Sequence, residues 1–431
     1  MQHADPIRAN RAPLDALSFF LADVKDGIGP FLAIYLVSAQ HWDAGSTGLV
    51  LTIGGIATVL ARGPAGALVD AVPWKRTLIA VSGVAVAAAA VAMALAPGFW
   101  PVAVAQSVNG VADAVFPSAV AAISLGIVGR AAFTPRVGRN EAFNHAGNAV
   151  TAICAGLAGW LIAPSAVLWM VAALAATSIA AAYAVRGRDI NQETARGADD
   201  GDHGKSDPES LSVLLRNRPL VVFTVAITLF HFANAAMLPL LGEKLSLHHA
   251  RQGSLIIGAC ILTAQVVMVP MAILVGGKAD AWGRKPIFLA GFLVLPVRGL
   301  LYTLVQIPEA MVSIQVLDGI GAGIFGALFF IVVADLTNGS GRYNLALGLA
   351  SASWGLGAAL SNAVAGQIVN LAGFNAAFLF LAACAGLALL VFWTGVPETR
   401  GWEPAARRAL GGAKGAPARI AHLTQTPPHS L

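Results

Sequence analysis

The segment Gly276-Gly-Lys-Ala-Asp280-Ala-Trp-Gly283-Arg284-Lys285 is a short polar stretch between two long apolar runs. Residues 252–275 precede it and residues 286–306 follow it. Each run is long enough to cross a bilayer, which takes about 20 mainly apolar residues. The segment therefore predicts two antiparallel membrane helices joined by a short charged turn.

A second copy of this arrangement lies in the first half of the chain. Gly66-Ala-Leu-Val-Asp70, followed by Trp74-Lys75-Arg76, stands 210 and then 209 positions earlier. Gln106-Ser-Val-Asn-Gly110 matches Gln315-Val-Leu-Asp-Gly319 at 209, and so do Pro30 and Pro239. Several markers in one register predict a duplicated transporter, with a binding site where the two halves meet at mid-membrane.

The apolar runs predict an all-α membrane protein of twelve helices. The first six are expected at 14–39, 46–69, 77–96, 100–127, 140–162 and 165–185, and the second six at 219–242, 252–275, 286–306, 309–333, 344–369 and 374–395. Residues 186–218 are rich in Asp, Gly, Arg and Lys without an apolar period, which is typical of a flexible linker. The expected domains are an N-terminal segment 1–13, six-helix bundles 14–185 and 219–395, the linker 186–218 and a tail 396–431, in which Ala405 to Leu410 could form a short surface helix.

The composition agrees with a membrane protein. Only 11% of the 431 residues are charged and 57% are hydrophobic, whereas a soluble domain has about 25% charged residues. A soluble fold of this length would need far more polar surface, so much of this surface must face lipid. Cys154, Cys260 and Cys384 stand singly in apolar runs, which predicts buried packing rather than disulfides or a metal site.

The distribution of basic residues predicts the orientation. Of the 27 Lys and Arg residues, Lys244 and Arg251 fall on one side, and Lys25, Arg62 and Arg298 fall within helices. The other basic residues fall on the side of both termini and the linker, which is the cytoplasmic side by the positive-inside rule. The expected location is the inner (plasma) membrane with both termini in the cytoplasm. The excess of positive charge is topological, and it does not indicate a nucleic-acid partner.

The segment from Gly276 to Lys285 resembles the G-x-x-x-D-x-x-G-R-[RK] loop of the major facilitator superfamily, at the expected place between helices 8 and 9. The first copy between helices 2 and 3 is a degraded form of it, and the likeness covers residues 14–395. The resemblance implies two pseudo-symmetric six-helix bundles and a loop that latches the halves in one conformation. It carries over as gating residues Gly66, Asp70, Gly276, Asp280, Gly283 and Arg284. The alternative role of each loop is a basic anchor at the membrane surface.

Helix 1 carries charges deep in its apolar run. An ionisable side chain at this depth costs a few kcal/mol, so Asp23 and Asp26 are functional candidates, and as neighbouring carboxylates they suit a proton carrier. Lys25 needs a partner, for which we expect Asp113 on helix 4, near Asn109. The alternative is a static Lys–Asp pair that holds helices 1 and 4 together.

Helix 5 begins with a polar stripe of side chains on one face: Glu141, Asn144, His145 and Asn148. These side chains would lose hydrogen bonds against lipid, and they could instead bind a polar solute or a proton. The alternative is a hydrogen-bonded seam between helices.

The second half offers His231 and Asn234 on helix 7, Arg298 on helix 9 and Asp318 on helix 10. A buried, permanently charged Arg298 must meet a carboxylate, either Asp318 or that of an anionic substrate. His231 is a candidate proton carrier or a packing residue. Arg62 is close enough to the cytoplasmic end of helix 2 to extend its charge to the membrane surface.

These features favour a secondary transporter of a small organic solute that works by alternating access and uses protons. Export is the first interpretation, because Asp26-Gly-Ile-Gly-Pro30 resembles an exporter pattern, and proton-linked uptake of an organic anion is the alternative. No ATP-binding loop G-x-x-x-x-G-K-[ST] and no catalytic motif is present, so neither ATP, a cofactor, a metal nor an enzyme activity is expected. A polytopic enzyme or sensor is the remote alternative. The partners are the solute, protons and lipid, and the expected state is a monomer.

Overall fold

The computed structural model describes residues 6–26, 28–195, 216–248, 250–305, 307–337 and 343–401. Over these ranges the chain is helical and has no strand. Nine of the described helices are long and apolar enough to cross a membrane. One of them, Ala346–Gly395, contains a reversal of the chain at Gly373, so it supplies two crossings.

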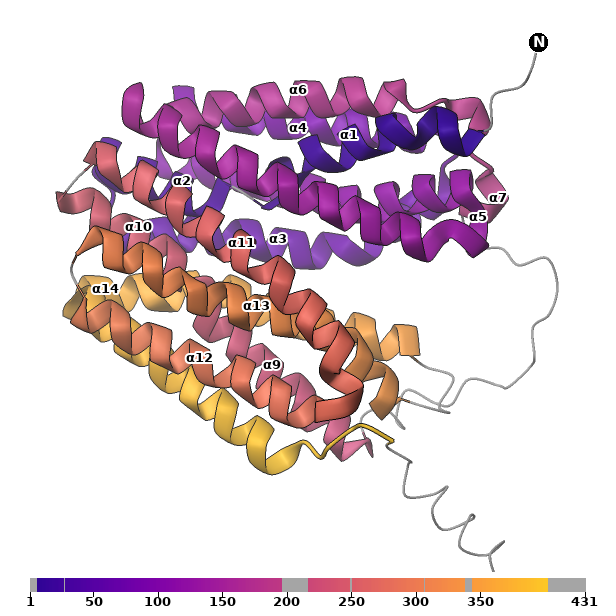
Figure 1. The fold of residues 1–431 in the computed structure, drawn as a ribbon. Helices are drawn as coiled ribbons and strands as arrows, with labels where there is room; N and C mark the ends of the chain where they lie inside the picture. Colours follow the sequence, from indigo (N-terminus) through magenta and orange to yellow (C-terminus); the bar gives the residue numbers. More distant parts are fainter. Residues whose placement is uncertain are drawn as a thin grey trace, which may run out of the picture.

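The first half is built from one set of helices (Figure 1). Its members are α1 (Pro6–Asp26), α2 (Ile28–Ile34), the π-helical turn η1 (Tyr35–Ala39), α3 (Ala44–Ala71), α4 (Lys75–Leu95), α5 (Phe99–Leu161) and α6 (Ala166–Ala184). The first crossing comprises α1, α2 and η1. Inside α5, Gly129 has φ of 68° and ψ of 173°, a conformation that only glycine adopts at little cost. The chain turns there, so α5 contributes the fourth and fifth crossings.

The second half repeats this plan. After η2 (Gly187–Asp189) and α7 (Gln192–Ala195), its helices are α9 (Arg218–Ala235), α10 (Met237–His248), α11 (Ala250–Trp282), α12 (Arg284–Leu304), α13 (Pro308–Leu336) and α14 (Tyr343–Gly395). Gly373, with φ of 83°, divides α14 into the eleventh and twelfth crossings. The seventh crossing is α9 plus α10. It is interrupted at Ala236 because Pro239 has no N–H to donate to the carbonyl of Ala235.

The repeat seen in the sequence recurs in the packing. A β-carbon on Gly110 of α5 would lie 2.3 Å from the carbonyl oxygen of Gly54 on α3. A β-carbon on Gly319 of α13 would lie 2.6 Å from the carbonyl oxygen of Ala264 on α11, the residue 210 positions after Gly54. In both halves the fourth helix therefore packs its glycine directly against the backbone of the second helix. The two bundles are related by the predicted pseudo-symmetry.

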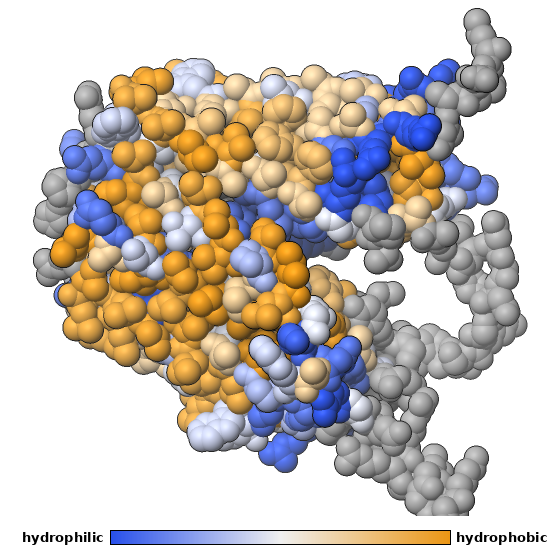
Figure 2. Space-filling view, in the orientation of Figure 1, coloured by the Kyte–Doolittle hydropathy of each residue, from blue (hydrophilic) through white to orange (hydrophobic). Residues whose placement is uncertain are grey.

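The two bundles meet at one end and separate at the other (Figure 1). We call the end that carries Val185 and Arg216, which border the linker, the linker end, and the opposite end the distal end. Figure 2 shows that apolar residues cover most of the outer surface and that hydrophilic residues gather at the linker end of both halves. The same view shows an indentation between the halves on that side. The outer surface suits lipid, and the indentation between the halves lies at the linker end.

Several details differ from the sequence-based expectations. The first helix begins at Pro6, because residues before Leu14 continue it beyond the apolar run. The residues between 127 and 140 are helical apart from the kink at Gly129, so the fifth helix begins earlier than predicted. Cys154 is exposed on the outer surface, where a thiol can face lipid, whereas Cys260 is buried and Cys384 half-buried.

The predicted linker and tail are in part ordered. Ile190 and Ala195 are buried against the first half, and the backbone N–H of Asn191 donates to the carbonyl of Gly126 at 2.9 Å. The first part of the predicted linker, up to Ala195, is therefore packed against the first half and is not a flexible connection. The predicted surface helix 405–410 lies outside the described residues.

Candidate functional site

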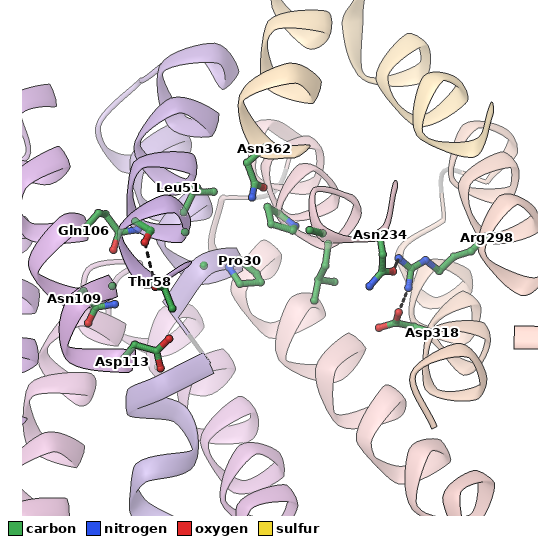
Figure 3. Close-up of a pocket in the computed structure, with 17 residues that line it drawn as sticks. Pro30, Leu51, Thr58, Gln106, Asn109, Asp113, Asn234, Arg298, Asp318 and Asn362 are labelled. Atoms are coloured by element: carbon green, nitrogen blue, oxygen red, sulfur yellow. Dashed lines mark hydrogen bonds and ion pairs between the residues drawn. The ribbon is translucent and has the colours of Figure 1, made fainter. Parts of the chain in front are cut away.

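A cavity of about 410 Å³ lies between the two halves at mid-height. Its walls come from both bundles, as Figure 3 shows. The residues that line it are Gly29, Pro30, Leu51, Gly54, Gly55, Thr58, Gln106, Asn109, Gly110, Asp113, Asn234, Ala235, Leu238, Pro239, Arg298, Asp318 and Asn362. Five of the sequence candidates therefore lie together: Asn109, Asp113, Asn234, Arg298 and Asp318.

The wall of the first half is polar. Gln106, Asn109 and Asp113 lie on one face of α5 at spacings of three and four residues, and they point into the cavity (Figure 3). The buried side-chain oxygen of Asn109 has no hydrogen-bond partner among the described residues. A buried amide oxygen without a donor is costly, so it is available to a solute that donates a hydrogen bond.

The wall of the second half holds an arginine whose positive charge is compensated by a carboxylate. Arg298 is 3% exposed and forms an ion pair with Asp318. Its guanidinium also donates to the side-chain oxygen of Asn234 at 2.5 Å and contacts the sulfur of Met237 at 3.3 Å. Of the two partners predicted for Arg298, the structure shows the carboxylate of Asp318. Asp318 stands 209 positions after Asn109, so equivalent positions of the repeat face each other across the cavity.

His231 lines a smaller side cavity of about 120 Å³ that shares Asn234, Arg298 and Asp318 with the central one. Its ring stacks on Trp354 with centroids 4.3 Å apart, and Nε2 has no partner in the described part of the chain. The Arg62 guanidinium lies 5.6 Å from the centroid of the same Trp354 ring. Arg62 therefore reaches the other half rather than only the membrane surface.

The polar stripe of the fifth helix does not line the central cavity. Glu141 is exposed and borders, with Asn144, a separate small cavity inside the first half. His145 shares a hydrogen bond of 2.9 Å with Gln265 on α11, across the two halves. Asn148 is 9% exposed, and its side-chain oxygen has no described partner. The four side chains of the stripe thus lie in different environments, and His145 joins the two bundles by a hydrogen bond.

The backbones of Asp23, Lys25 and Asp26 belong to α1, but their side chains lie outside the described part of the structure. The predicted contact between Lys25 and Asp113 also falls there. Gly29 and Pro30, shortly after them, line the central cavity.

The charged turn of the second half is held by contacts within its own bundle. Arg284 pairs with Asp280 at 2.8 Å and with Asp335 at 3.1 Å. Glu398 accepts hydrogen bonds from the backbone N–H groups of Arg284 and Lys285 at 2.9 and 3.0 Å, and thereby caps α12. Burial opposes its charge, but these N–H groups and that of Arg400 hold the pKa of Glu398 below its usual value.

The corresponding turn of the first half is less connected. Asp70 is exposed, and the structure gives it no hydrogen bond or ion pair with a described residue. Lys75 instead donates to Gln192 at 3.0 Å, and Arg76 donates to the carbonyl of Val185 at 2.7 Å.

The glycines of these two turns serve no close packing in this conformation. A β-carbon on Gly66 or Gly276 would meet no atom of the described residues within 4 Å. The two turns lie at the linker end, where the bundles are apart, so no described residue of the other half approaches them. Gly283 has a different requirement, a φ of 88° immediately before α12.

The distal end is closed by direct contacts between α3 and α14. Thr52 donates to the carbonyl of Ala359 at 2.7 Å and accepts from the N–H of Ala363 at 2.9 Å. The Asn370 amide donates to Asp43 at 2.6 Å. A β-carbon on Gly48 would lie 2.1 Å from the carbonyl oxygen of Asn362. Among the described residues, the hydrogen bonds between the two halves thus lie in this region or at His145, and the linker end has none.

Sequence reasoning missed several lining residues. Thr58 and Asn362 are ordinary polar residues in apolar helices, with no repeat partner to mark them. Gln106 did have a marker, because Gln315 matches it. The two have diverged: Gln106 lines the cavity, whereas Gln315 donates to the hydroxyl of Tyr302 inside the second bundle.

The described residues contain no group of three or more His, Cys, Asp or Glu side chains that could hold a metal ion. The site is therefore a polar cavity between two bundles, with amide, hydroxyl and carboxylate groups on its walls. Such a cavity can bind a small organic molecule by hydrogen bonds.

Comparisons with known proteins agree with this architecture. The family model described as Major Facilitator Superfamily matches residues 15–295 and 254–427. Two sequences from strains of Mycobacterium tuberculosis, the MFS-type transporters MT2531 and Rv2456c, are each 50% identical to the chain over 400 residues, which cover 92% of this chain and 95% of the relative.

Solved structures share the fold at low identity. A mutant form of the nucleoside transporter NupG aligns with a TM-score of 0.76 and 15% identity over 90% of this chain and all of that chain. The D-xylose-proton symporter aligns with a TM-score of 0.68 and 14% identity over 91% of this chain and 98% of that chain. With the family model matching most of its length and half of its residues shared with these transporters, the chain belongs to the major facilitator superfamily and is a multi-pass membrane transporter rather than an enzyme.

Proposed function

We propose that the protein exports a small, neutral, hydrogen-bonding organic solute in exchange for protons, by alternating access of the central cavity. The observation that carries the proposal is the cavity itself, which has polar walls from both bundles and is closed at the distal end. A solute held there would contact both halves, so their relative movement would expose it to one side at a time.

The proposed orientation places the linker end in the cytoplasm. Most Lys and Arg residues fall on the segments at that end, as the positive-inside rule requires of cytoplasmic segments. The described conformation is then open to the cytoplasm and closed to the outside. Export is preferred because Asp26 to Pro30 resembles the exporter pattern on helix 1.

The lining chemistry supports a neutral solute. The side chains of Gln106, Asn109, Asn234 and Asn362 can both donate and accept hydrogen bonds. The one cation among the described lining residues, Arg298, is already paired with Asp318. Binding a carboxylate there would leave Asp318 without its partner, so uptake of an organic anion is the less favoured alternative.

Proton coupling is proposed for Asp23 and Asp26. A carboxylate near mid-membrane resists ionisation unless water or a cation reaches it. Protonation would remove that cost and permit the cavity to close, which would tie one proton to one step of the cycle. Asp26 is the preferred carrier, because it precedes Pro30 of the cavity wall by one turn.

The test is a solute screen in proteoliposomes with an imposed pH gradient. We expect uphill transport of a neutral solute by the wild type and its loss in Asp23→Asn or Asp26→Asn, with solute exchange at equal pH retained by the variant. Glu309→Gln, at an exposed carboxylate at the start of α13, is the matched control and should transport normally. Full pH-driven accumulation by both Asp variants would show that helix 1 does not carry the proton, and His145 with Glu141 would become the next candidates.

A further inference from the structure

A buried carboxyl group lies at the closed distal end, away from the central cavity. Glu243 belongs to α10 and is 1% exposed, and its Oε2 has no hydrogen-bond partner in the described part of the structure. The neighbouring Gly242 marks this level of α10 as an interface between the halves, because its β-carbon would lie 3.1 Å from the Ile34 side chain of α2. Glu243 is therefore buried where the two bundles meet.

No described cation compensates Glu243. The ammonium group of the adjacent Lys244 donates to the carbonyl of Tyr302 at 3.2 Å and to Asn375 at 3.3 Å, within the second half. The Ser246 hydroxyl donates to the backbone carbonyl of Glu243 rather than to its carboxyl group. The side chains of His248, His249 and Arg251 lie outside the described residues.

Among the described residues, the charged group that acts on Glu243 is another carboxylate, Asp43. Asp43 precedes α3 and is partly buried, which opposes its charge. However, the Ser46 hydroxyl, the Asn370 amide and the Ser46 N–H hold its pKa at about 2. Asp43 is thus negatively charged at any physiological pH, and it repels a negative charge on Glu243. The neighbouring turn η1 carries one titratable side chain, Tyr35, whose hydroxyl donates to the carbonyl of Met93 at 3.5 Å.

From this geometry we infer that Glu243 is a proton-binding site of the distal gate: the gate closes over the protonated side chain and opens when that proton is lost. A buried, unpaired carboxylate is far more costly than the neutral acid, so the closed form selects the protonated group. Opening the distal end admits water to α10, and the carboxylate can then ionise. Repulsion from Asp43 and the cost of desolvation then oppose closure.

The site differs from the coupling carboxylates of helix 1. Its proton comes from the distal solution and returns to it, because the closed gate separates Glu243 from the linker end. Acid on the distal side therefore favours the conformation that is open at the linker end, and alkali favours the opposite one. The inference rests on the alternating-access cycle proposed above, but it requires neither a particular solute nor coupled proton transport.

The experiment measures the two ends without a solute. Cys154, Cys260 and Cys384 are replaced by serine, and spin labels are placed at the exposed Ala39 and Ala372 of the distal end. Pulsed electron resonance then gives the distribution of distances in lipid nanodiscs between pH 5 and 9. We expect the ratio of open to closed distal gate to rise with pH, by up to about tenfold per unit for one proton. Glu243→Gln, which imitates the protonated group, should keep the gate closed over the whole range.

Matched variants isolate the group responsible. Glu309→Gln removes an exposed carboxylate and should retain the pH dependence of the wild type. The double variant His248→Gln/His249→Gln should retain it as well. A pH-independent wild type, a Glu243→Gln variant that titrates as the wild type does, or loss of the pH dependence in the histidine variant would overturn the inference. This experiment measures no flux. A failure of proton-coupled transport in proteoliposomes would therefore count against the proposed function and not against this inference.

Discussion

The two ends of the cavity are closed to different degrees, and the contacts that hold them differ in kind. At the distal end, α3 and α14 touch through glycine and through the hydroxyl of Thr52, with backbone atoms in direct contact. At the linker end, the charged turns satisfy their side chains inside their own bundle, as Arg284 does with Asp280 and Asp335. Contacts between the halves must form and break during transport, whereas contacts within one half can persist. The distal end is therefore the closed gate of this conformation. The linker-end turns are ordered within their own bundles but make no contact between the halves among the described residues.

The largest effect is expected from Gly48→Leu. A β-carbon at this position already overlaps the carbonyl oxygen of Asn362, so a leucine prevents the distal end from closing. Because a transporter must visit both conformations, we expect turnover to fall at least about 100-fold. The measurement is solute exchange in proteoliposomes, with folding followed by gel filtration and thermal melting.

Gly386→Ala is the control for Gly48→Leu, because no atom of the described residues lies within 4 Å of its β-carbon position. It should transport normally. Turnover of Gly48→Leu near that of the wild type would mean that this contact is not required in the cycle.

The next effect concerns Thr52→Val, which keeps the shape of the side chain and removes the hydroxyl. Two hydrogen bonds between the halves are lost, one with Ala359 and one with Ala363. At about 1 kcal/mol for each bond, the closed distal gate should become about 5- to 30-fold less favoured. The label pair Ala39 and Ala372 measures this ratio directly. Thr303→Val, which loses a hydroxyl bonded only within its own helix, should leave the ratio unchanged.

A smaller effect is expected at the linker end from Asp280→Asn. The pair with Arg284 is exposed, with 89% of the Asp280 side chain accessible, so its loss costs at most about 1 kcal/mol. Turnover should fall by up to about fivefold, while solute affinity changes little, because the lesion affects exchange between conformations and not the cavity. Single-turnover flux and equilibrium binding separate the two. An unchanged turnover would leave Asp280 only a role in anchoring the turn.

The smallest effect is expected from Glu398→Gln, which weakens the cap on α12. Loss of a charged cap costs about 1 kcal/mol and should lower the melting temperature by a few degrees. Because the pKa of Glu398 lies below its usual value, this stabilisation is complete at neutral pH and is lost only as the pH falls below the ordinary value of 4.5. The difference between variant and wild type should therefore be constant from pH 6 to 8 and shrink in stronger acid. A difference that grows in acid would contradict the assignment.

The sequence predicted the architecture well, because hydrophobic length and internal repeats are properties of the chain itself. The twelve crossings, the symmetric glycines and the pair of Arg298 with Asp318 are all accessible from spacing and charge. Thr52 and Glu243 were not predicted. Thr52 acts through its hydrogen bonds to Ala359 and Ala363 of the other bundle, and Glu243 acts through the lack of a described partner where the bundles meet. No periodic pattern in the sequence indicates such contacts.

The turns at the linker end show the same limit. Their motif indicated a latch between the halves, but the motif is the same whichever conformation is populated. In the described part of the structure no atom lies within 4 Å of a β-carbon placed on Gly66 or Gly276, because the bundles are apart at that end.

Alternating access is tested most directly by measuring both ends in one molecule. Labels at the exposed Ala71 and Ala281 report the linker end, and labels at Ala39 and Ala372 report the distal end. In the wild type at acidic pH, the distal distance should be short and the linker-end distance long. Gly48→Leu should lengthen the distal distance and shorten the linker-end distance. A distal end that opens while the linker-end distance stays long would contradict the account.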